Sequence, residues 1–123
     1  MANTLCWTDI PVRDLDRSVS FYSAVLGSTV QKIALEDGTV FGLLPCENSE
    51  PSGCLVKGPD QVPSHHGAMV YLSVEGRMDA ALGAVGKVGG KVLQPKHSIA
   101  PHGFRAVIED SEGNRVALHS MAE

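Results

Sequence analysis

The chain has 123 residues, of which 43% are hydrophobic and 20% are charged, and its formal net charge is -4. This length and composition fit one soluble domain with one packed core. Acidic and basic residues are interspersed, which excludes the basic stripe of a nucleic-acid-binding or membrane-surface protein. The apolar runs are too short to span a bilayer.

Cellular location is inferred from the cysteines and from the N-terminal sequence. Three cysteines are present without a C-x-x-C pair, namely Cys6, Cys46 and Cys54. An odd number without paired spacing indicates reduced thiols rather than a disulfide framework or a zinc knuckle. The first residues show no export signal, so we expect a cytoplasmic protein.

Hydrophobic periodicity and turn residues predict the elements in chain order. We expect a strand over 5–12, a helix over 15–26, strands over 30–35, 39–44 and 53–57, a strand over 68–74, a helix over 78–88, and strands over 91–97, 104–109 and 115–120. Asp14 or Asp16 can cap the first helix, and Gly27 can end it. Asp37-Gly38 is a hairpin signal.

The predicted order is β-α-β-β-β twice, and a gapless internal register supports a repeat. Ile10 matches Leu72, and Gly27 matches Gly89, each 62 residues later. The glycine shared by both halves ends a helix in each, so the match reflects a common backbone conformation and not only a common hydrophobic pattern. We therefore expect one domain over 1–123, with module one at about 4–58, a linker at about 59–67 and module two at about 68–121.

The fold class expected from this repeat is α+β, with two curved mixed sheets around a cavity and the helices outside. Alternation along the strands assigns the two faces of each sheet. Ile10, Val12, Leu72, Val74, Val116 and Leu118 should face the helices, and Trp7, Asp9, Met69, Tyr71, Ala117 and His119 should face the cavity.

Two segments carry a resemblance to a known family. The run IPVRDLDRSVSFY at 10–22 resembles the opening of the vicinal oxygen chelate superfamily, which includes glyoxalase I, bleomycin-resistance proteins and extradiol dioxygenases. The run DSEGNRVALHS at 110–120 resembles its final hairpin. The resemblance covers nearly the whole chain and implies this fold and, commonly, a homodimer, but the scaffold hosts unrelated activities.

The resemblance also implies where a metal ion would sit. The family's metal enzymes hold a divalent ion through the first and last strands of each half, which here are the positions of Trp7, Leu55, Met69 and Ala117. None of these side chains is the His, Asp or Glu that such an ion requires. We therefore expect no metal and no other cofactor. The sequence is most similar to a metal-free, glyoxalase-like bacterial branch, on the evidence of 55–58 (LVKG) and 113–120 (GNRVALHS).

Several inward positions are candidates for ligand contact. Trp7 can stack on a ligand, Met69 and Tyr71 can line the same pocket, and Lys57 can hold an anion. Leu55 and Ala117 occupy the vacated metal positions. Each of these residues also has an ordinary structural role as core or surface. His97 and His102 flank a loop that should border the cavity mouth.

His119 and Asp9 are the candidate catalytic residues, since either can fix a ligand or transfer a proton. The leading interpretation is a glyoxalase- or bleomycin-resistance-like protein that binds a small, partly apolar molecule without metal. A metal-independent lyase or isomerase, a metal enzyme with relocated ligands, and a dimeric domain with a filled interior remain open. The sequence is compatible both with an enzyme and with a non-catalytic binding protein.

Overall fold

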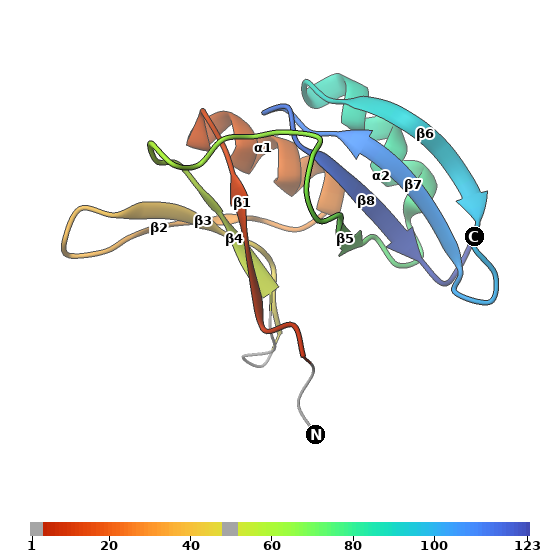
Figure 1. The fold of residues 1–123 in the computed structure, drawn as a ribbon. Helices are drawn as coiled ribbons and strands as arrows, with labels where there is room; N and C mark the ends of the chain where they lie inside the picture. Colours follow the sequence, from red (N-terminus) through yellow and green to blue (C-terminus); the bar gives the residue numbers. More distant parts are fainter. Residues whose placement is uncertain (1–3, 48–51) are drawn as a thin grey trace.

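The computed structural model describes residues 4–47 and 52–123, and its elements follow the predicted order (Figure 1). The first module contains β1 (Trp7–Pro11), α1 (Leu15–Leu26), β2 (Gln31–Ala34), β3 (Val40–Leu43) and β4 (Ser52–Val56). The second contains β5 (Val70–Ser73), α2 (Met78–Val85), the 3₁₀ turn η1 (Gly86–Val88), β6 (Lys91–Ser98), β7 (Phe104–Glu109) and β8 (Arg115–Ser120). The prediction of two βαβββ modules is confirmed.

Local sequence sets the ends of both helices as expected. The Asp14 side chain accepts a hydrogen bond from the Arg17 backbone N–H at 3.0 Å, which caps the start of α1. Gly27 ends α1 in the left-handed conformation, with a φ of 68°. In the second module, η1 continues α2 until Gly89, whose φ is 94°. The first glycine of the predicted pair therefore ends this helical segment.

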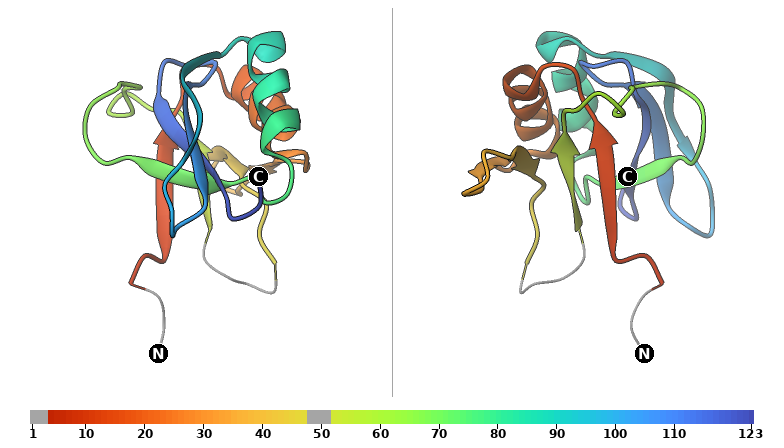
Figure 2. Two further views of the ribbon diagram at one scale, coloured as in Figure 1. Left: turned by 90° about the vertical axis from the view of Figure 1, so that its right-hand side faces the viewer. Right: turned by 60° about the vertical axis from the view of Figure 1, so that its left-hand side comes forward.

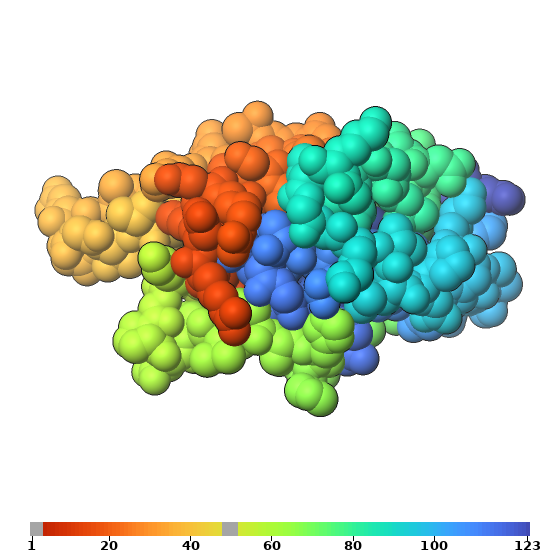
Figure 3. Space-filling view, turned by 90° about the horizontal axis from the view of Figure 1, so that it is seen from above, coloured from red at the N-terminus to blue at the C-terminus, as the bar shows by residue number. Residues whose placement is uncertain are grey.

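Each module forms a four-stranded mixed sheet, with the orders β1-β4-β3-β2 and β5-β8-β7-β6. The two helices lie on the same side of the molecule, where α1 packs on α2 (Figure 2). The core lies beneath them, and the residues predicted to face the helices are buried there, with Leu72 partly buried against it. Seen from above, the β2–β3 hairpin projects at the far end of the first module (Figure 3).

The two sheets are not closed into a barrel. Among the described residues, β1 pairs only with β4 and β5 pairs only with β8, each in parallel. One edge of each of these strands is therefore free. This arrangement corrects the expectation of an enclosed cavity, because the space between the modules is open.

A buried polar network joins the last hairpin to the first module. The Tyr22 hydroxyl donates to Asp110 Oδ2 at 2.5 Å, and both side chains are almost fully buried. Asn114 Nδ2 donates to the Pro11 carbonyl at 2.7 Å and to Asp110 Oδ2 at 2.9 Å. The contacts of Tyr22 with Asp110 and of Asn114 with Pro11 join residues 88 and 103 positions apart, so they hold the two modules in one arrangement.

Glu112 is the second link between the modules. It accepts hydrogen bonds from the backbone N–H groups of Arg13 and Asp14 and from the Arg17 guanidinium. Burial alone would raise the pKa of Glu112, but the hydrogen bonds from Arg17, Asp14 and Arg13 outweigh it and lower the pKa to about 2. Most of the hydrogen bonds that the buried Glu112 carboxylate accepts therefore come from module one.

Among the described residues, no helix has the length and hydropathy to cross a bilayer.

Candidate functional site

An open cleft of about 620 Å³ lies between the modules, along the free edges of β1 and β5. Consecutive residues of 68–73 line one wall, and residues of β1, α1 and β4 line the other. Most of the lining residues are apolar, and the large ones include Leu5, Trp7, Leu26, Leu44, Met69, Tyr71 and Leu72. Three of the predicted ligand-contacting residues, Trp7, Met69 and Tyr71, are therefore brought to one cleft.

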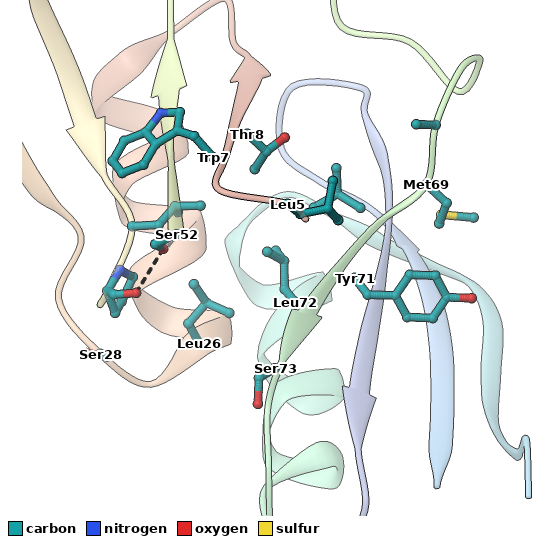
Figure 4. Close-up of a pocket in the computed structure, with 14 residues that line it drawn as sticks. Leu5, Trp7, Thr8, Leu26, Ser28, Ser52, Met69, Tyr71, Leu72 and Ser73 are labelled. Atoms are coloured by element: carbon teal, nitrogen blue, oxygen red, sulfur yellow. Dashed lines mark hydrogen bonds between the residues drawn. The ribbon is translucent and has the colours of Figure 1, made fainter. Parts of the chain in front are cut away.

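The two large aromatic residues lie on opposite walls and do not face each other (Figure 4). Trp7 belongs to the β1 wall beside Ser52, while the Tyr71 ring points away from Trp7, toward the second sheet. Leu5 lies between the walls, and its side chain is 83% exposed. Trp7 and Tyr71 are each about half exposed, so the cleft has accessible apolar surface on both sides.

The register of β4 corrects the expected place of Leu55. Leu55 pairs with Ile10, is fully buried and belongs to the core under the helices. Neighbouring residues in register share a face of the sheet, so Cys54, which pairs with Asp9, lies on the concave side instead. Leu118 pairs with Leu72 in the second module, so the internal repeat shifts by one residue at the last strand.

The same shift separates Lys57 from the concave face. Lys57 is exposed just beyond the end of β4 and does not line the cleft. Ala117 does lie on the concave face, where it pairs with Tyr71 and Val107, and it is fully buried there. A direct ligand contact by Ala117 therefore stays a prediction.

With the corrected register, Trp7, Cys54, Met69 and Ala117 occupy the positions that the resemblance assigns to metal ligands. Three of them offer no oxygen or nitrogen donor, and a hard divalent ion needs several such donors converging. The fourth is the Cys54 thiol; burial raises its pKa and so disfavours the thiolate that binds metal. Within 4–47 and 52–123, no three His, Cys, Asp or Glu side chains gather in a metal-binding group. These residues do not fit a divalent metal site.

The candidate catalytic residues lie on different sheets. Asp9 is exposed on β1 and accepts a hydrogen bond from Cys54 Sγ at 3.3 Å. His119 lies on β8, and its Nε2 is 2.7 Å from the His102 carbonyl oxygen. Since a carbonyl only accepts, His119 Nε2 carries the proton there. No hydrogen bond joins Asp9 to His119 in the described part of the chain, so their joint role in proton transfer stays a prediction.

Arg105 is a residue of this region that the sequence interpretation missed. Its Nη1 donates to the Tyr71 hydroxyl at 2.8 Å, and its Nε donates to His97 Nε2 at 3.2 Å. Arg105 also pairs across the sheet with His119. The signal was available in the sequence, because strand alternation places Arg105 on the face of Val107, opposite the buried Ala106.

Comparison with known proteins agrees with this architecture. The family model of the glyoxalase/bleomycin resistance protein/dioxygenase superfamily matches residues 4–118. No curated protein matches the chain significantly.

Solved structures share the fold at low sequence identity. A glyoxalase/bleomycin resistance protein from Albidiferax ferrireducens T118 is 17% identical, with a TM-score of 0.71 over 96% of this chain and 98% of that one. A protein of the same description from Catenulispora acidiphila DSM 44928 is 19% identical, with a TM-score of 0.64 over 96% and 98%. The fosfomycin resistance protein FosX from Listeria monocytogenes is 16% identical, with a TM-score of 0.68 over 98% and 92%.

At these identities the solved structures support the fold alone, whereas the family model covers nearly the whole chain. The chain therefore belongs to the glyoxalase/bleomycin resistance protein/dioxygenase superfamily.

Proposed function

We propose that this protein binds a small, partly apolar organic molecule in the cleft between its two modules. The observation that carries the proposal is the cleft itself, whose volume of about 620 Å³ falls within the usual range for small-molecule sites. Its lining combines apolar side chains with the hydroxyl groups of Thr8, Ser52 and Ser73. Such a surface favours a ligand with an apolar body and a few polar atoms.

We propose further that binding needs no divalent metal. Support comes from the donor set of Trp7, Cys54, Met69 and Ala117, which lacks the oxygen and nitrogen ligands of a hard cation. Dialysis against EDTA should leave ligand affinity unchanged, and elemental analysis of the purified protein should find no stoichiometric zinc, nickel, manganese or iron. A metal at one ion per chain, whose removal abolishes binding, would refute this part of the proposal.

A second copy of the chain is the proposed cover for the open sheets. The free edges of β1 and β5 and the exposed apolar side chains of Leu5, Trp7 and Tyr71 together support association. Sedimentation equilibrium should give about twice the chain mass of 13.0 kDa at micromolar concentration. A monomer at all accessible concentrations would contradict it.

The binding proposal is tested with a fragment library and two matched variants. Ligands that bind only the folded state raise the melting temperature, and the only tryptophan, Trp7, reports binding by fluorescence. Met69→Ala should weaken the hits several-fold, because Met69 lines the cleft. Met121→Ala is the control, since Met121 is 57% exposed near the C-terminus and does not line the cleft. Equal affinities in both variants, or no stabilising fragment at all, would argue against the cleft as a binding site.

A further inference from the structure

We infer that the concave face of the second sheet holds an anion subsite, centred on Arg105, that binds a carboxylate group of the ligand. The inference rests on the proposed function, because it names the chemical class of the molecule bound in the adjoining cleft. The cleft lining alone predicts a partly apolar ligand, and the anion subsite predicts that this ligand also carries a carboxylate.

Arg105 is a cation without a carboxylate partner in the described part of the chain. Each ion pair found there involves another residue. The acidic residue nearest along its own strand is Glu109, four positions away, or about 13 Å at the usual rise of a strand. Glu109 is already engaged by His65 at 2.6 Å and lies 3.9 Å from Lys91. Glu75, whose charge acts on the neighbouring His119, accepts hydrogen bonds from the backbone N–H groups of Met121 and Ala122. Arg105 therefore makes no ion pair in the described part of the chain.

Two neutral side chains hold the Arg105 guanidinium in place. His97 Nε2 accepts a hydrogen bond from Arg105 Nε, so His97 Nε2 carries no proton. His97 Nδ1 lies 2.9 Å from the Pro95 carbonyl oxygen and donates to it. His97 is thus neutral in this arrangement. The Tyr71 hydroxyl accepts from Nη1, which leaves its own proton free to donate. Arg105 is pre-organised without loss of its charge.

Further polar side chains lie in the same row of the sheet. Ser73, His119, Arg105 and His97 are successive neighbours across β5, β8, β7 and β6, and strands are spaced by about 4.8 Å. The Nε2 proton of His119 is already donated to the His102 carbonyl. A carboxylate placed over this row would therefore meet Arg105 and the Tyr71 hydroxyl together.

Tyr71 links the anion subsite to the cleft. It lines the cleft between the modules, and Figure 4 shows its ring directed away from Trp7, toward the sheet that carries Arg105. A ligand whose apolar body lies against Tyr71 and Met69 would place its end near the guanidinium. The flat fork of an arginine matches the two oxygens of a carboxylate, which makes an organic acid the expected ligand class.

The test compares two probes of nearly the same shape, the anion naphthalene-2-carboxylate and the neutral naphthalene-2-carboxamide. Isothermal titration calorimetry on the wild-type protein should show tighter binding of the carboxylate. Arg105→Gln should weaken the carboxylate by about ten- to hundredfold, the range for losing a charge-assisted pair, and leave the carboxamide within about twofold. Arg105→Lys keeps the charge but loses the fork, so an intermediate loss is expected.

Arg13→Gln is the matched control, because Arg13 is exposed and its side chain makes no hydrogen bond in the described part of the chain. Melting temperatures of all variants show whether they fold, and Arg105→Lys carries the test if Arg105→Gln does not. Equal carboxylate affinity in the Arg105 variants and in Arg13→Gln, with both probes bound, would overturn the anion subsite and leave the binding proposal standing. Failure of both probes to bind the wild-type protein at millimolar concentration would count against both proposals.

Discussion

Substituting Tyr22 by Phe removes one oxygen atom from the centre of the network that joins the modules. The Tyr22 hydroxyl is buried and donates to Asp110 at 2.5 Å, while its ring packs edge-on against Phe21 with the centroids 4.9 Å apart. Tyr22→Phe keeps that ring packing. The change therefore isolates the hydrogen bond between the two modules.

The expected cost follows from what Asp110 retains. Its oxygens still accept from the Glu112 and Asn114 backbone N–H groups and from Asn114 Nδ2, so the carboxylate is not left bare. One buried hydrogen bond to a charged group contributes about 1.5 to 3 kcal/mol. We therefore expect the free energy of unfolding to fall by about 2 kcal/mol and the melting temperature to fall by about 8 °C for a domain of this size.

Urea denaturation followed by circular dichroism measures this change, at one protein concentration for all variants. Tyr71→Phe is the matched control, because it removes the same atom from a half-exposed ring whose partner is Arg105. That variant should cost less than about 0.5 kcal/mol. If Tyr22→Phe were as stable as Tyr71→Phe, the bond between Tyr22 and Asp110 would not be what holds the modules together.

Three further predictions concern stability. The pKa of Glu112 is about 2 in the folded state and about 4.3 in the unfolded state, so its stabilising contribution should be present above pH 4.3 and lost as the pH falls toward 2. Denaturation curves taken at successive pH values measure this loss of stability. Glu112→Gln should abolish it. Gly27→Ala should lower the melting temperature more than Gly38→Ala. Both have positive φ, but only at Gly27 would the added Cβ lie 2.6 Å from the Arg77 guanidinium, whose hydrogen bond to the Val25 carbonyl would have to shift. Leu55→Ala should cost about 2 to 5 kcal/mol in urea denaturation and Cys54→Ala clearly less; the reverse order would contradict the register of β4.

The sequence was sufficient to predict the elements because local chemistry sets their ends. Asp14 caps α1, and Gly27 and Gly89 end the helical segments with positive φ, all within a few residues of the boundary they define. The network around Tyr22 and Asp110 was not predictable in this way. Its partners are 88 residues apart, and no spacing pattern indicates a contact between modules.

The error at Leu55 comes from unequal strand and loop lengths in the two modules. The gapless register holds through the helices because both modules have the same spacing up to that point. Strands β6 and β7 are longer than β2 and β3, which adds residues to the second module, while the turn over 110–114 is shorter than the stretch over 44–51, which removes some. The two differences do not cancel, so the offset at the last strands is 63 rather than 62. Since side chains alternate along a strand, a shift of one residue exchanges the two faces. Leu55 therefore goes to the core, and Cys54 takes its expected place.

The cleft is open because each module forms the backbone hydrogen bonds of its first strand within its own sheet. Parallel pairing with β4 and β8 occupies one edge of β1 and of β5, and the helix pair and the network at Tyr22 fix the modules without any pairing between those two strands. Closing the gap would require moving a module against this network. The free edges and the exposed Trp7 are therefore built into the folded chain, and burying them requires another molecule, either a ligand along the cleft or a second copy across it.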